Sequence, residues 1–124
     1  MSTNALIKID GSKDCIYSHW DGYPSYIGPI LLKHFNKKRK VKKLLALGNI
    51  SILNRLLVPR TKNHSFSFPD DRVTIAYHRD RGEEFAMGDN FSYDYFYIFK
   101  NGDWYMGTSD GRTLLRDIMK KNHE

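Results

Sequence analysis

The chain has 124 residues, 40% of them hydrophobic and 14% aromatic, which fits one globular domain and excludes a disordered chain. Its formal net charge of +6 is uneven, because residues 1–62 carry 12 Lys/Arg and 3 Asp/Glu, whereas residues 63–124 carry 8 and 11. Cys15 is the only cysteine, which excludes an intrachain disulfide. The first residues lack the pattern of a signal peptide, and no apolar run approaches the roughly 20 residues of a membrane helix. We therefore expect a cytoplasmic protein with no membrane partner.

The N-terminal part predicts a strand pair followed by a helix. Residues 5–9 and 15–19 are expected to be strands, joined by a turn at residues 10–12. Residues 26–36 have apolar side chains at helical spacing, with Pro29 suited to the first turn of the helix.

The middle of the chain predicts a second helix over residues 37–47 and a short helical turn within residues 50–57. Residues 59–72 contain two prolines and predict a long loop, a kind of segment that is often functional or mobile. Residues 73–77 are expected to be a strand, and residues 78–84 a charged loop.

The C-terminal part contains the clearest hairpin signal. Residues 93–100 and 104–106 are joined by Asn101-Gly102, which favours a two-residue hairpin turn. Residues 113–121 predict a closing amphipathic helix. The whole chain, residues 1–124, is therefore expected to be a single ligand-binding α+β domain, a mostly antiparallel sheet with helices on one side.

The basic run at residues 37–43 has two interpretations. Six cations in seven residues resemble a nucleic-acid footprint. Alternatively, Val41, Leu44 and Leu45 form a buried stripe, and the cations occupy the solvated remainder of a helix. We favour the second interpretation, so a nucleic-acid partner is not expected.

The sequence does not predict catalysis. His78-Arg79-Asp80 matches part of the protein-kinase catalytic loop, but Phe85 stands where that loop needs a metal-binding asparagine. The five histidines do not occur at two-ligand spacing. Four acids could supply a catalytic carboxylate pair: Asp80, Glu83, Glu84 and Asp89. Clustered acids in a loop are more commonly just solvated, and we favour that interpretation. We expect no metal, no cofactor and no catalytic residue.

The aromatic run at residues 93–99 is expected to present rings on both faces of a strand. Because side chains alternate along a strand, four residues would share one face: Tyr93, Tyr95, Tyr97 and Phe99. Phe96 and Ile98 would lie on the other face. The second face could hold a subunit interface, stack on a base, or pack beneath further helices. We expect a homo-oligomer, at least a dimer.

Two arginines of the predicted last helix suit a phosphate. Arg112 and Arg116 are four residues apart and would share one helical face, with Arg112 at the helix N-terminus. Their forked donors suit a phosphate or diphosphate. The alternative is a solvated Arg116 that pairs with Asp117.

The chain resembles a family of small phage proteins, the anti-Thoeris sponges. The resemblance lies in residues 5–7 and in Tyr17-Ser18-His19-Trp20-Asp21-Gly22-Tyr23-Pro24, followed by the aromatic hairpin and the Arg-bearing C-terminal segment. It implies an oligomeric protein that sequesters cyclic ADP-ribose isomers made by a host TIR-domain immune protein, without degrading them. Such a protein would act in the cytoplasm of the host cell.

The resemblance also implies a ligand site in the second half of the chain. Adenine would stack on Phe85 or on a strand tyrosine such as Tyr95. The phosphates would meet Arg112 and Arg116, and the ribose hydroxyls would meet Asn90 and Asp94. Two rival classes stay open. One is an inhibitor that binds a host nucleic-acid-targeting effector through its basic surface, and the other is a small nucleotide hydrolase that uses the acids of residues 80–89.

Overall fold

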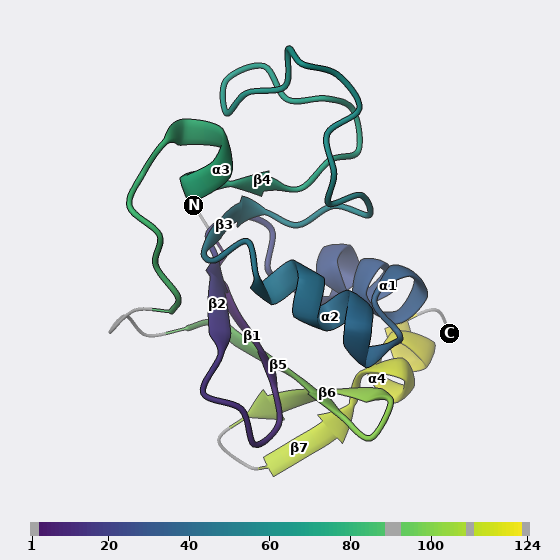
Figure 1. Cartoon of the computed structure of the whole chain (residues 1–124). Coiled ribbons are helices and arrows are strands. Elements are labelled where there is room, and N and C mark those ends of the chain that lie inside the picture. The colour runs from purple at the N-terminus through teal and green to yellow at the C-terminus, as the bar shows by residue number, and fades with distance from the viewer. Residues whose placement is uncertain (1–2, 89–92, 109–110, 123–124) are drawn as a thin grey trace.

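The computed structural model of the chain describes residues 3–88, 93–108 and 111–122 (Figure 1). Within these residues, seven strands form one sheet in the order β4-β3-β2-β1-β5-β6-β7. The strands are β1 (Ala5–Ile9), β2 (Cys15–Ser18), β3 (Ile50–Ile52), β4 (Ile75–Ala76), β5 (Tyr95–Lys100), β6 (Asp103–Thr108) and β7 (Gly111–Leu114). The helices are α1 (Pro24–His34), α2 (Lys38–Leu45), α3 (Tyr77–Arg81) and α4 (Leu115–Asn122). The predicted α+β class is confirmed.

The sheet is mixed rather than purely antiparallel. β1 pairs antiparallel with β2 and parallel with β5, and β2 pairs parallel with β3. The β3–β4, β5–β6 and β6–β7 pairs are antiparallel. The strands at the centre of the sheet therefore come from opposite ends of the chain.

Helices α1, α2 and α4 gather on one side of the sheet (Figure 1). Alternation along β1 buries Ala5, Ile7 and Ile9, while Leu6 and Lys8 are only half-buried. The helices add a further set of fully or nearly fully buried side chains to the same core: Ile27, Leu31, Val41, Leu44, Leu45, Leu115 and Met119. None of the helices in the described parts of the chain is long and apolar enough to cross a bilayer.

Gly22 joins β1, β5 and the start of α1. Its N–H donates to the Thr3 carbonyl at 2.8 Å, and its own carbonyl accepts the buried Tyr97 hydroxyl at 2.7 Å. A Cβ at this position would lie 2.8 Å from the Ala5 Cβ, so only glycine fits the close approach. Asp21, just before it, has φ of 55°. The centre of the His19–Pro24 block is thus a tightly packed structural joint.

The helical turn predicted within residues 50–57 is wrong. Ile50–Ile52 form β3, which pairs with β2 at Ser18 and with β4 at Ala76. The β-branched Ile-Ser-Ile sequence suits a strand with neighbours on both sides. The loop predicted at residues 78–84 is also partly wrong, because α3 occupies Tyr77–Arg81 and ends at Gly82 with φ of 74°.

Helix α1 begins earlier than predicted. Pro24 takes its first turn, where the missing N–H of proline costs nothing, and Pro29 lies inside the helix rather than at its start. The last helix begins later than predicted. Strand β7 precedes it, with Arg112 opposite Gly107 and Thr113 opposite Met106 in the β6–β7 register. Arg112 is therefore a strand residue.

Candidate functional site

Helix α2 carries a dense group of exposed cations. Val41, Leu44 and Leu45 pack into the core, as predicted, and this leaves Lys37, Lys38, Arg39, Lys42 and Lys43 in solvent. Among the ion pairs formed between described residues, none involves a side chain of residues 37–43. Burial lowers the pKa of His34, and the nearby charges of Lys33, Arg55 and Lys40 lower it further. Helix α2 therefore presents a concentration of positive charge to solvent.

Two hairpin turns lie beside this helix. The β1–β2 turn contains Gly11 with φ of 77°, and the β5–β6 turn contains Asn101 and Gly102 with φ of 51° and 83°. Both turns need left-handed residues, and the Asn-Gly sequence supplies them in the second, as predicted. They place β1, β5 and α2 around a common hollow.

Two adjoining cavities form a basic groove along α2. A cavity of about 590 Å³ is lined by Ile9, Asp10, Gly11, Ser12, Asp14, Lys38, Lys42, Leu45, Ala46 and Met87. A cavity of about 450 Å³ is lined by Ile9, Asp10, Asn36, Lys37, Lys38, Phe99, Lys100, Asn101 and Gly102. Ile9, Asp10 and Lys38 line both. We call the two cavities together the α2 groove.

The α2 groove combines three kinds of chemistry. Lys38 and Lys42 are one turn apart and face the same cavity, while Lys37 and Lys100 face the other. Asp10 and Asp14 supply hydrogen-bond acceptors. Four apolar residues also line the two cavities: Ile9, Leu45, Met87 and Phe99. Such a lining suits a ligand with anionic, hydroxyl-bearing and apolar parts.

Arg112 reaches the edge of this groove from β7. Its Nη1 lies 2.9 Å from Oδ1 of Asp10, an ion pair between the two ends of the chain. Arg116, which lies on α4, is 4.0 Å from Asp103. The prediction that both arginines share one face of the last helix is wrong, because Arg112 lies in a strand and each arginine has its own carboxylate.

The predicted aromatic residues lie in different parts of the fold. Phe85 is exposed, its ring meeting His78 edge-on at 5.5 Å, close to the backbone of Gly48. Tyr95 is half-buried, packs against the core and stacks on Tyr97 at 6.3 Å. The structure does not bring Phe85 and Tyr95 into one site with the arginines.

The remaining predicted site residues lie away from the α2 groove or outside the described residues. Asp94 accepts a hydrogen bond from the Asn4 N–H at 3.1 Å, and its own N–H donates to Asn4 Oδ1 at 2.8 Å. Asn90 lies outside the described residues. Tyr93 precedes β5, and its ring lies 5.6 Å from Phe96 and 6.1 Å from Tyr17. The Tyr93 ring therefore packs beside the Phe96 ring, whereas the sequence predicted that it would share a face with Tyr97.

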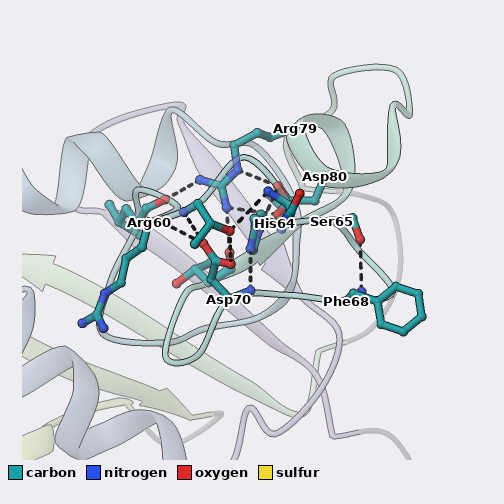
Figure 2. Close-up of polar contacts among 12 residues, drawn as sticks. Arg60, His64, Ser65, Phe68, Asp70, Arg79 and Asp80 are labelled. Atoms are coloured by element: carbon teal, nitrogen blue, oxygen red, sulfur yellow. Dashed lines mark hydrogen bonds and ion pairs between the residues drawn. The ribbon is translucent and has the colours of Figure 1, made fainter.

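Asp80 belongs to a buried polar network that fixes a loop (Figure 2). Its Oδ2 accepts from the Ala76 N–H at 2.8 Å and from Arg79 Nη2 at 3.0 Å, and its Oδ1 accepts from Arg79 Nε at 2.8 Å. Arg79 also donates to the Thr74 and Leu57 carbonyls. Burial raises the pKa of Asp80, but the hydrogen bonds from Arg79 and Ala76, together with the nearby His64 ring, outweigh it and leave this pKa lowered.

His64 connects the long loop to this network. Its Nδ1 accepts the Asp70 N–H at 2.8 Å, so the proton of the neutral ring lies on Nε2. Nε2 lies 3.1 Å from Asp80 Oδ1, although not in the alignment of a well-formed hydrogen bond. The side chains of His64 and Asp80 are only 3% and 2% exposed. Asp80 is therefore a structural anion, and Asp89, predicted as a possible partner, lies outside the described residues.

No cluster of three or more His, Cys, Asp or Glu in residues 3–88, 93–108 and 111–122 is arranged to hold a metal ion. Comparison with known proteins adds no relative: no family model matches the sequence, and neither a curated protein nor a solved structure matches it.

Sequence reasoning missed the acidic and apolar side of this groove. The basic run at residues 37–43 was visible, but the long-range approach of Asp10, Lys100 and Met87 to it was not. One available signal was the pair of left-handed turns, Asp10-Gly11-Ser12 and Asn101-Gly102, because turns of this kind end neighbouring strands at one edge of a sheet.

Proposed function

We propose that this protein is a phage anti-defence sponge that binds a cyclic ADP-ribose-type nucleotide in the α2 groove and holds it without degrading it. The observation that carries the proposal is the basic lining of the two adjoining cavities, with Lys38 shared between them. The resemblance of the His19–Pro24 block supplies the chemical class of the ligand. Thoeris-type immunity would be blocked because the signal no longer reaches its host receptor.

The groove matches the parts of such a ligand. Cavities of about 300–1,000 Å³ bind molecules of this size, and the larger cavity measures about 590 Å³. Lys38 and Lys42 suit the diphosphate, and the carboxylates of Asp10 and Asp14 suit ribose hydroxyls. Met87 supplies a polarisable surface for the edge or face of a base.

Binding without reaction fits the groove better than hydrolysis. Among the described residues that line the two cavities there is no histidine and no cysteine. The carboxylate of Asp10 is engaged by Arg112, and the Oγ of Ser12 accepts the Asp14 N–H at 3.1 Å. Within the described residues, no hydrogen bond joins the Ser12 hydroxyl to a side chain that could act as its general base.

A capture experiment tests this proposal. The purified protein is mixed with cyclic ADP-ribose isomers, separated from free ligand and heat-denatured, and the released molecules are analysed by mass spectrometry. A sponge returns the isomer intact, whereas a hydrolase returns products. Retention of none of the isomers would contradict the proposal.

A matched pair of lysine variants locates the site. Lys42 lines the larger cavity, whereas Lys43, the next residue of the same helix, lines neither cavity and is also exposed. Losing one charge-assisted hydrogen bond costs about 1.5 kcal/mol at an exposed site, so Lys42→Gln is expected to weaken binding about tenfold in calorimetric titration. Lys43→Gln should bind like the wild type. Equal affinities for both variants would remove the ligand from the α2 groove.

A second candidate is an inhibitor that binds a host nucleic-acid-targeting effector. It is favoured by the five exposed cations of residues 37–43, which form no ion pair with the other described residues. This protein would capture no cyclic nucleotide. Its binding to the effector would fall steeply with salt, and Lys43→Gln would weaken it as much as Lys42→Gln.

A further inference from the structure

The two cavities of the α2 groove differ in their balance of charge. Two lysines and two aspartates line the larger cavity: Lys38, Lys42, Asp10 and Asp14. Three lysines and one aspartate line the smaller cavity, which measures about 450 Å³: Lys37, Lys38, Lys100 and Asp10. Positive and negative side chains are thus equal in number around the larger cavity, whereas cations are in excess around the smaller one.

Apolar surface is distributed in the opposite way. Leu45, Ala46 and Met87 line only the larger cavity. The apolar lining of the smaller cavity consists of Ile9, which also lines the larger one, and Phe99, which is buried. A nucleobase therefore finds its apolar surface in the larger cavity, and the smaller cavity is suited to a small anionic group.

The lysines of the smaller cavity have no carboxylate partner among the described residues, because none of the ion pairs formed there involves them. Lys100 lies opposite Asp103 in the β5–β6 register, but Asp103 pairs with Arg116, at 4.0 Å. Asp10 is paired with Arg112 at 2.9 Å. Helix α2 also begins at this cavity, with no side-chain cap and no acid in its first turn, which adds partial positive charge. The excess of positive charge is therefore uncompensated.

We propose that the smaller cavity is a subsite for a phosphate monoester, and that the nucleotide held in the α2 groove carries such a group in addition to its diphosphate. A phosphate monoester has a charge of about −1.5 to −2 at neutral pH and three strong acceptor oxygens, which matches a lining with three lysines. Ile9, Asp10 and Lys38 line both cavities, so one ligand can occupy the two together. The ligand class is thus a ribose-phosphorylated cyclic ADP-ribose. This class rests on the proposed function, whereas phosphate binding in the smaller cavity does not.

Inorganic phosphate tests the subsite without any nucleotide. In an NMR titration at constant ionic strength, the amide signals of Lys100 and Gly102 should shift to saturation, and that of Ser12, which lines only the larger cavity, should move less. Lys100→Gln should weaken phosphate binding about tenfold, the effect of one lost charge-assisted hydrogen bond. Lys43→Gln removes the same charge outside both cavities and should titrate like the wild type. Shifts that do not saturate, or equal binding by the two variants, would overturn the subsite.

A matched pair of ligands tests the ligand class. Cyclic ADP-ribose and its 2′-phosphate differ by one phosphate group, and calorimetric titration should show that the phosphorylated form binds about tenfold more tightly. Lys100→Gln should bring the ratio of the two affinities close to one, because Lys100 lines only the smaller cavity. Lys42→Gln should weaken the binding of both ligands and keep the ratio, because Lys42 lines only the larger cavity. Circular dichroism of each variant confirms that it is folded.

The outcomes separate this proposal from the proposed function. A wild-type affinity ratio near one, or a ratio that Lys100→Gln leaves unchanged, would overturn the proposal while the protein still captures nucleotide. Phosphate binding that Lys100→Gln weakens, without retention of either nucleotide, would support the subsite and contradict the sponge. That second result would also reject a cyclic nucleotide as the occupant of the smaller cavity.

Discussion

Replacing Asp80 by asparagine should loosen the long loop through the loss of a single acceptor. Each carboxylate oxygen of Asp80 faces an Arg79 N–H and one further donor, the Ala76 N–H at Oδ2 and the His64 Nε2 at Oδ1. An amide in either orientation therefore points its NH₂ group at two donors. The Asp80→Asn side chain keeps its size, so the effect reports polar chemistry and not packing.

The expected loss of stability follows from the burial of the partners. Removing one member of a buried ion pair costs about 3–5 kcal/mol. The Arg79 side chain is 26% exposed, so water solvates part of the unpaired guanidinium, and the remaining amide oxygen still accepts; we expect about 2–3 kcal/mol. At about 4 °C per kcal/mol for a chain of this length, Tm should fall by about 8–12 °C.

The pH dependence gives this prediction a second measurement. The pKa of Asp80 is lowered in the folded state, so its stabilisation is complete above the unfolded value of about 3.9 and is lost as the pH falls through the folded pKa. Thermal melts followed by circular dichroism should show a wild-type advantage over Asp80→Asn that is constant near neutrality and shrinks below about pH 4.

A nearby acid provides the control. The Asp71 side chain is 85% exposed, so Asp71→Asn should change stability by less than about 0.5 kcal/mol. An Asp80→Asn melt that coincides with wild type at neutral pH would refute the role given to the network. A difference that persists unchanged to pH 3 would refute the contribution of the ionised carboxylate.

Three further substitutions probe the joint between β1, β5 and α1 and the packing of α4, all read from urea unfolding midpoints. Tyr97→Phe leaves the Gly22 carbonyl without its buried donor and should cost about 1–2 kcal/mol; a midpoint equal to wild type would show that water replaces the hydroxyl. Gly22→Ala puts a Cβ 2.8 Å from the Ala5 Cβ and should cost more than about 2 kcal/mol. Gly28→Ala meets only the flexible end of Met119, at 2.8 Å, so it should cost less than about 1 kcal/mol, and equal losses for the two glycine variants would contradict this reasoning.

The segments predicted correctly are those whose local pattern and tertiary role agree. The alternation in Ala5–Ile9, the apolar stripe of α2 and the Asn101-Gly102 turn each indicate a structure that the neighbouring elements also require. The helical turn predicted within residues 50–57 was wrong because Ile50–Ile52 becomes a strand only through pairing with β2 and β4. Those partner strands lie far away in sequence.

The candidate site differs from the one predicted from the sequence. Two arginines, a stacking aromatic ring and polar side chains were expected in the second half of the chain, whereas the α2 groove is lined by lysines, aspartates and mainly aliphatic side chains. Arg112 was predicted at the N-terminus of the amphipathic helix expected over residues 113–121, whereas pairing with β6 places it in β7. Its ion pair with Asp10 spans nearly the whole chain, and no local pattern reports contacts of that kind.

The parallel pairing of β1 with β5 has a consequence for synthesis of the protein on the ribosome. Ala5 lies opposite Tyr95 and Ile9 opposite Phe99, so β1 waits for its partner until most of the chain has been translated. During that interval one edge of β1 is open to pairing with other strands, beside a core that still lacks Tyr97, Trp104 and Leu115. Release of a truncated chain near residue 88 would give a product that contains α1, α2 and α3 and yet has an unpaired strand at what should be the middle of its sheet. Such a fragment is a substrate for chaperones and proteases rather than a smaller working version of the protein.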